Sequence, residues 1–441
     1  MQRQRWKILG IGLVAMGLGW SMAQSPVKVS FWHSMGGVNG EAVDRMVKAY
    51  NASQSACVVE PTYVGSYDDG LTKLQAALRG KNPPHIQQIY DLGLQAMAES
   101  GQIIPASDLA RQDKYDLSGI LFPLARYYNL DGKYYGIPFN ASTAELYYNV
   151  DALKAAGFTR PPKTFEEFVD YARKLTKKDA NGNVIQYGAT IRVYGWFIEQ
   201  LIYNQGGYVV NNENGRTKRA TAVTYNGPEG MRAVKWIVDM TREGLMPNVG
   251  RDGAAQRQAF TSGKAAMFVE STATLGAVQR EVGGRFQFKT APLPRPEGTK
   301  GGTAIGGAAL YVFKGHPDNE VKCAWDFIKY AISPKVQFEW HKATGYYPVS
   351  RAAIELPETK AYWKENPNAK TPVDIILSSP PTKSSQGAVA GVMPQIRQHI
   401  EEAMELAIAG KASVEEALNQ AAQKSNEAIA RYDPARGAGF L

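Results

Sequence analysis

The chain has 441 residues, of which 44% are hydrophobic and 21% charged, and its formal net charge is +9. This length exceeds what one hydrophobic core serves, so two or three domains are expected. The cations are spread along the chain without a basic block or an aromatic RNA-binding run, which argues against nucleic-acid binding and leaves a mildly positive field suited to an anionic ligand.

The first 23 residues predict an export signal. Three cations precede the apolar run 8–20, which is too short and too rich in glycine for a membrane span. Small residues at Ser21 and Ala23 stand where a signal peptidase reads, so cleavage is expected after Ala23. No later segment has 18 uninterrupted apolar residues, so we expect a soluble periplasmic protein, with a retained signal anchor as the alternative.

Strand and helix signals then alternate. Apolar patterns predict strands over 27–32, 58–64 and 86–90, and helical spacing predicts helices over 41–50 and 67–79. A β-α-β-α-β run implies a parallel sheet with ligand groups at the carboxyl ends of its strands. Asp91 directly follows the third strand, where a carboxylate could accept hydrogen bonds from ligand hydroxyls or simply cap the next helix.

Later elements have clear boundaries. Two capping boxes, Thr164 with Glu167 and Ser413 with Glu416, predict helices that run to about 175 and 431. The Pro- and Gly-rich segment 291–302 is interpreted as an extended crossover, and 137–140 could be another. The alternating pattern favours an α/β fold in two lobes joined by several crossovers.

The sequence contains no catalytic signature. It has no nucleophile elbow, P-loop or His-Glu-x-x-His motif, and its five histidines lack metal-ligand spacing. We therefore expect no catalytic residue, metal or cofactor, which disfavours an enzyme such as a metal-dependent phosphodiesterase. The glycine-rich turn 36–40 is interpreted as a strand-to-helix connection, although a ligand contact there stays open.

The two cysteines lie far apart. Cys57 falls in a strand-like run and Cys323 in a helical one. Export would permit a disulfide. Two buried free thiols are nevertheless the preferred interpretation.

Short motifs carry a family resemblance over essentially the whole mature chain. They include Phe31-Trp32-His33-Ser34-Met35, Gln88-Ile89-Tyr90-Asp91-Leu92-Gly93, Pro138-Phe139-Asn140-Ala141-Ser142-Thr143, Ile305-Gly306-Gly307-Ala308 and Met393-Pro394-Gln395-Ile396-Arg397. In this order they resemble the glycerol-3-phosphate-binding branch of the family 1 solute-binding proteins of ABC importers. The first and last motifs are the most specific to that branch.

The resemblance implies a type II clam-shell, in which each lobe is a mainly parallel sheet flanked by helices and the ligand lies in the interlobe cleft. The expected lobes are 24–137 with 295–335, and 138–294 with 336–441. The implied ligand is sn-glycerol-3-phosphate or a glycerophosphodiester such as glycerophosphocholine, with an oligosaccharide as the alternative on the same fold. The implied partners of this monomer are membrane permease subunits and, through them, a cytoplasmic ATPase.

Motif positions also imply the ligand residues. These are Tyr67, Asp91, Ser142, Ser271 or its neighbour Thr272, Gly307, Tyr346 and Arg397. Arg397 follows Pro394 in the first turn of a predicted helix, where a phosphate could meet a guanidinium and free backbone N–H groups together. An ordinary surface arginine on an amphipathic helix is the alternative.

Two positions depart from the family pattern. Asp91 stands where glutamate is usual, and Ile191-Arg192-Val193-Tyr194 lacks the tryptophan that usually precedes the segment matching Gly195-Trp196. Both changes leave more room, so the pocket is expected to suit a larger diester whose quaternary ammonium could meet tyrosine faces and Asp91. Tyr194 could instead refill the space.

Overall fold

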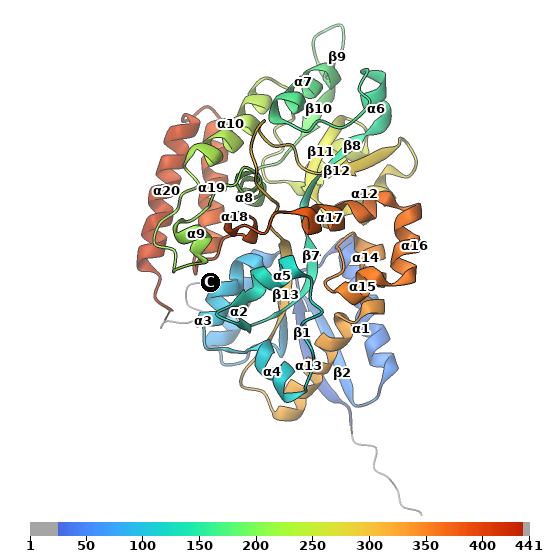
Figure 1. The fold of residues 1–441 in the computed structure, drawn as a ribbon, viewed down its shortest axis with the longest axis vertical. Helices are drawn as coiled ribbons and strands as arrows, with labels where there is room; N and C mark the ends of the chain where they lie inside the picture. Colours follow the sequence, from blue (N-terminus) through green and yellow to red (C-terminus); the bar gives the residue numbers. More distant parts are fainter. Residues whose placement is uncertain (1–24, 435–441) are drawn as a thin grey trace, which may run out of the picture.

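The computed structural model describes residues 25–434, so the predicted export signal lies outside the described residues. Two sheets form the centres of two lobes, which lie one below the other in Figure 1. Within 25–434, no helix is both long enough and apolar enough to cross a membrane.

The first lobe is built on a sheet with strand order β2-β1-β3-β13-β4, and β7 also pairs with β13. Parallel pairing joins β1 to β2 and to β3, because helices cross over between them, as expected. β13 runs antiparallel to β3, β4 and β7. The strands are β1 (Val27–His33), β2 (Cys57–Tyr63), β3 (Ile86–Tyr90), β4 (Ile103–Ile104), β7 (Ile137–Ser142) and β13 (Gly306–Phe313).

The second lobe is built on a sheet with strand order β12-β8-β11-β10-β9. Only β10 and β11 pair in parallel in this sheet, while β8 is antiparallel to both β11 and β12. The two-lobed α/β fold is confirmed, but the sheets are mixed rather than mainly parallel, because strands that arrive from the other lobe run against their neighbours. The strands are β8 (Ala144–Asn149), β9 (Lys177–Lys178), β10 (Val184–Thr190), β11 (Ala265–Ser271) and β12 (Phe288–Ala291).

Helices flank both sheets (Figure 1). Those of the first lobe are α1 (Gly37–Ser53), α2 (Tyr67–Arg79), α3 (Leu94–Glu99), α4 (Ala106–Gln112), α5 (Phe122–Tyr128), α13 (Asp318–Ala331), α14 (Pro334–Thr344) and α15 (Arg351–Glu355), with the hairpin β5 (Asn129–Leu130) and β6 (Lys133–Tyr134). The remaining helices are α6 (Val150–Ala155), α7 (Phe165–Leu175), α8 (Gly195–Asn204), α9 (Asn211–Gly215), α10 (Pro228–Arg242), α11 (Gly253–Thr261), α12 (Leu275–Val282), α16 (Pro357–Glu365), α17 (Pro367–Ser378), α18 (Lys383–Gln386), α19 (Met393–Ile408) and α20 (Val414–Arg431).

Predicted caps set the ends of two of these helices. Ser413 and Glu416 form the expected reciprocal capping box at the start of α20. At α7, the Thr164 hydroxyl accepts from the backbone N–H of Glu167 at 3.1 Å. The Glu167 carboxylate binds Arg160 instead of reaching back to the cap, so this box is only half formed.

Extended segments join the lobes. β7 of the first sheet and β8 of the second are separated by Thr143 alone, and 292–305 leads from β12 back to β13. The predicted crossover 291–302 overlaps the second of these segments, whereas 137–140 lies within β7, so the first crossover follows the range predicted for it. The lobe boundaries stay a proposal. Because β7 pairs in the first sheet and α14 packs against α1, we propose that the first lobe extends to about Thr143 and also holds α14.

Cys57, at the start of β2, and Cys323, on α13, form a disulfide with their Cα atoms 5.7 Å apart. The expectation of two free thiols is therefore wrong. The sequence separation of 266 between the two cysteines concealed the pairing, because only the packing of α13 against the first sheet brings them together.

Replacing both cysteines with serine should lower the free energy of unfolding by roughly 2–4 kcal/mol, because the unfolded chain loses a covalent constraint. Urea titrations followed by tryptophan fluorescence would measure the loss. Reduced wild-type protein should unfold at the same urea concentration as the variant. If the variant and the oxidised wild type unfold at the same urea concentration, the disulfide does not stabilise the fold.

Candidate interlobe binding site

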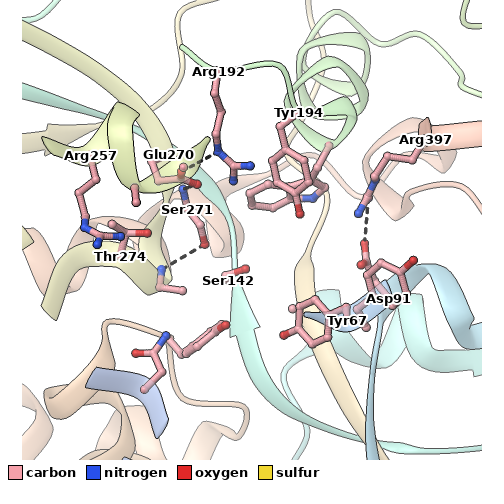
Figure 2. Close-up of a pocket in the computed structure, with 18 residues that line it drawn as sticks. Tyr67, Asp91, Ser142, Arg192, Tyr194, Arg257, Glu270, Ser271, Thr274 and Arg397 are labelled. Carbon is pink, nitrogen blue, oxygen red and sulfur yellow. Dashed lines mark hydrogen bonds and ion pairs between the residues drawn. The ribbon is translucent and has the colours of Figure 1, made fainter. Parts of the chain in front are cut away.

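A cavity of about 380 Å³ is walled by residues of both lobes (Figure 2). Of the implied ligand residues, those that line it are Tyr67, Asp91, Ser142, Ser271, Gly307, Tyr346 and Arg397. The fully buried Thr272 is not among the lining residues, and its hydroxyl accepts from the backbone N–H of Thr143. Sequence reasoning had not proposed several other lining residues, which include Asn39, Tyr90, Arg192, Trp196, Arg257, Glu270 and Thr274.

The ends of strands bring these side chains together. Asp91 follows β3, Ser142 ends β7, and Ser271 ends β11. Gly307 lies near the start of the antiparallel β13, at the same edge of the first sheet. Its φ is +103°, and an added Cβ would collide with the carbonyl of Asn140, so only glycine allows β13 and β7 to approach this closely.

One end of the cavity holds a buried group of charges. Nε and Nη2 of Arg397 donate to the two carboxylate oxygens of Glu199, at 2.8 and 2.7 Å. Nη2 also lies 3.7 Å from Oδ2 of Asp91. Exposure of the three side chains does not exceed 8%, so Arg397 is not a surface arginine. Its guanidinium already pairs with carboxylates of this chain. The expectation that Arg397 is free to bind a phosphate did not include these carboxylates.

Glu199 lies on α8, all ten residues of which are buried. The sequence did carry a signal for it, because a glutamate within the otherwise largely apolar stretch of α8 needs a buried partner. Burial raises the pKa of Asp91 to about 7, with Arg397 lowering it and Glu199 raising it further. The charge of this group therefore lies between zero and −1 near neutral pH.

A chain of hydrogen bonds positions Tyr67. The backbone N–H of Ser34 donates to Gln88, the Gln88 amide donates to Asn140, and the Asn140 amide donates to the Tyr67 hydroxyl, all within 2.9 Å. The Tyr67 ring also stacks on Tyr90, with centroids 5.1 Å apart. Residues of the first three motifs thus support an aromatic wall of the cavity.

Tyr194 lies between two guanidinium groups. Cζ of Arg192 is 4.1 Å from the centre of its ring, and Cζ of Arg397 is 5.7 Å from it. Nε of Arg192 donates to Glu270 at 3.3 Å. The stretch that lacks the usual tryptophan therefore places a tyrosine and a cation on the cavity wall.

The other end of the cavity is polar as well. Figure 2 shows Arg257, Glu270, Ser271 and Thr274 together on the side opposite Asp91 and Arg397. Nε of Arg257 donates to Glu281 at 2.8 Å. The cavity thus has two polar ends with Tyr194 between them, a shape suited to an elongated polar ligand.

A possible metal cluster, His85, His316 and Glu320, lies outside the cavity lining. The backbone N–H of Ser30 donates to Nδ1 of His85, so Nε2 carries the proton of the neutral ring and shares it with Glu320 at 2.7 Å. This tautomer leaves no lone pair on Nε2 for a metal ion.

Comparison with known proteins gives a consistent result. A family model described as bacterial extracellular solute-binding protein matches residues 45–371. The sn-glycerol-3-phosphate-binding periplasmic protein UgpB of Brucella abortus (strain 2308) is 33% identical over 428 residues, which cover 95% of this chain and 96% of that protein.

Two solved structures share the fold. UgpB from Mycobacterium tuberculosis, in complex with glycerophosphocholine, superposes with a TM-score of 0.78 at 21% identity and covers 92% of this chain and 98% of its own. The GacH receptor of Streptomyces glaucescens, solved unliganded and with acarbose, gives a TM-score of 0.77 at 20% identity, with 93% and 100% coverage.

The raised pKa of Asp91 predicts a pH effect on stability. Between about pH 4 and pH 7 the folded chain holds a proton that the unfolded chain releases, so this carboxyl's contribution to the free energy of unfolding falls as pH rises. Asp91→Asn removes the titration, so the stability of the variant relative to wild type should rise between pH 5 and pH 8, by at most about 3 kcal/mol. Urea unfolding at both pH values measures the gain. A difference between the two proteins that is the same at pH 5 and pH 8 would contradict it.

Proposed function

The chain belongs to the bacterial extracellular solute-binding proteins, and from this we propose that its interlobe cavity captures a glycerophosphodiester such as glycerophosphocholine, or sn-glycerol-3-phosphate. Such proteins are the substrate-binding components of ABC importers, so the chain is such a component and not an enzyme. It delivers a small molecule to membrane permease subunits, which link it to a cytoplasmic ATPase. We propose that it does so as a periplasmic monomer, after cleavage near Ala23.

The observation that carries the ligand class is the set of three arginines that line the cavity: Arg192, Arg257 and Arg397. Guanidinium groups suit the planar, two-pronged recognition of a phosphate. The hydroxyls of Ser142 and Ser271 add donors for its remaining oxygens. The full-length likeness to glycerol-3-phosphate-binding proteins supports the same class.

The cavity size favours a small ligand. About 380 Å³ stands near the lower limit of ordinary ligand pockets, which span roughly 300–1,000 Å³. That volume suits a glycerophosphodiester better than a long oligosaccharide.

A sugar remains the second candidate, since a receptor crystallised with acarbose shares the fold. Tyr67, Tyr90 and Trp196 could pack on sugar rings. A neutral sugar would offer no charged group to the terminal nitrogens of Arg192, which makes it the less favoured ligand.

Calorimetric titration of residues 24–441, unfolded and refolded to remove carried-over ligand, would decide between these candidates. Glycerophosphocholine or sn-glycerol-3-phosphate should bind at least about tenfold more tightly than maltose, a difference of about 1.4 kcal/mol, because only the phosphates have a charged group for the arginines. Binding of maltose alone would overturn the proposed ligand class.

A further inference from the structure

We infer that Arg192 is the principal phosphate-binding residue of this cavity, in a seat formed with Ser142 and Ser271, and that the Asp91 end receives the ligand's hydroxylated or cationic portion. This inference rests on the proposed function and specifies how the ligand is recognised. Figure 2 shows the guanidinium of Arg192 pointing into the cavity, near the two serines. Arg192, Ser142 and Ser271 form the phosphate seat.

Arg192 has hydrogen-bonding capacity to spare. Its only recorded hydrogen bond within 25–434 is the 3.3 Å contact from Nε to Glu270, so both terminal nitrogens have no partner among the described residues. Its side chain is only 18% exposed, which places those donors in a largely dry wall. An unsatisfied guanidinium in such a place is suited to a charge-assisted pair with a phosphate.

Arg397 differs in this respect. Two of its nitrogens already form a bidentate pair with Glu199, and Asp91 lies beside the same guanidinium. A phosphate that approaches Arg397 would have to approach these two carboxylates as well. Coulomb repulsion in a buried site is strong, so this end disfavours an anion.

The balance of charge points the same way. One guanidinium faces two carboxylates at the Asp91 end, so the group is neutral when Asp91 is protonated and negative when it is ionised. At the phosphate seat, one guanidinium faces the single carboxylate of Glu270. Of the two ends, the seat is the one with no excess of negative charge.

Tyr194 fixes the position of Arg192. The guanidinium lies over the tyrosine ring at 4.1 Å, a cation–π contact that limits its motion before any ligand arrives. On the Asp91 side, the stacked rings of Tyr67 and Tyr90 offer faces for a quaternary ammonium or a carbon chain. A zwitterionic phosphodiester with its cation directed towards Asp91 matches both ends.

Two substitutions of opposite effect test the inference. Arg192→Gln should weaken the binding of glycerophosphocholine and sn-glycerol-3-phosphate by about tenfold or more, because it removes the seat's charge. Glu270→Gln should tighten the binding of both, because it removes the carboxylate that pairs with Arg192. A purely structural Arg192–Glu270 pair would give losses in both variants. Titration calorimetry gives the dissociation constants.

Controls separate binding from folding. Arg173→Gln disrupts an exposed arginine–glutamate pair of the same lobe, outside the cavity lining, and should leave both dissociation constants within about twofold of wild type. Arg192→Lys keeps the charge but loses the fork, so its affinity should lie between those of wild type and Arg192→Gln. If Arg192→Gln does not fold, Arg192→Lys and Glu270→Gln still carry the test.

The outcomes are distinct. Suppose that wild type binds the two phosphate ligands. If Arg192→Gln then binds them with the same affinity, or Glu270→Gln binds them more weakly, the phosphate seat is overturned and the proposed function stands. Wild type that binds neither phosphate overturns both. Opposite shifts in the two variants support the seat.

Discussion

A buried arginine that carboxylates of both lobes surround is the constraint on which this cleft depends. Asp91 comes from the first lobe, while Glu199 and Arg397 come from α8 and α19 on the other side. Removing these charges from water is costly, and only their mutual compensation makes the arrangement tolerable. The close approach of α8 to α19 serves this contact, because a Cβ at Gly195 would meet the Arg397 side chain at 2.7 Å.

The same constraint divides the cavity into chemically different ends. Since Arg397 is engaged by acids, the anion-binding capacity of the cleft shifts to the guanidinium on the far side of Tyr194. Two arginines that look equivalent in a list of lining residues are therefore not equivalent in function. A carboxyl with a pKa of about 7 at one end gives the chain a proton that it can hold or release near neutral pH.

Local patterns predicted much of this molecule. The helix Tyr67–Arg79 and the strand Ile86–Tyr90 have the expected bounds, because the signals for them are local in the sequence. Motif positions pointed to seven of the eighteen cavity-lining residues, Asp91 and Arg397 among them. The partners of Arg192 and Glu199, and the disulfide between Cys57 and Cys323, depend on which segments meet in space, and no short window of sequence records that. Strand direction in the mixed sheets depends on the crossovers in the same way.

The crossover at Thr143 has a kinetic consequence. One residue separates a strand of the first sheet from a strand of the second, and Ser142, which lines the cavity, is its immediate neighbour. If the lobes rotate about this point, the ligand's surroundings change as the cleft opens. The residence time of a bound molecule would then equal the lifetime of the closed form, and a permease that stabilised the open form would set the rate of ligand release.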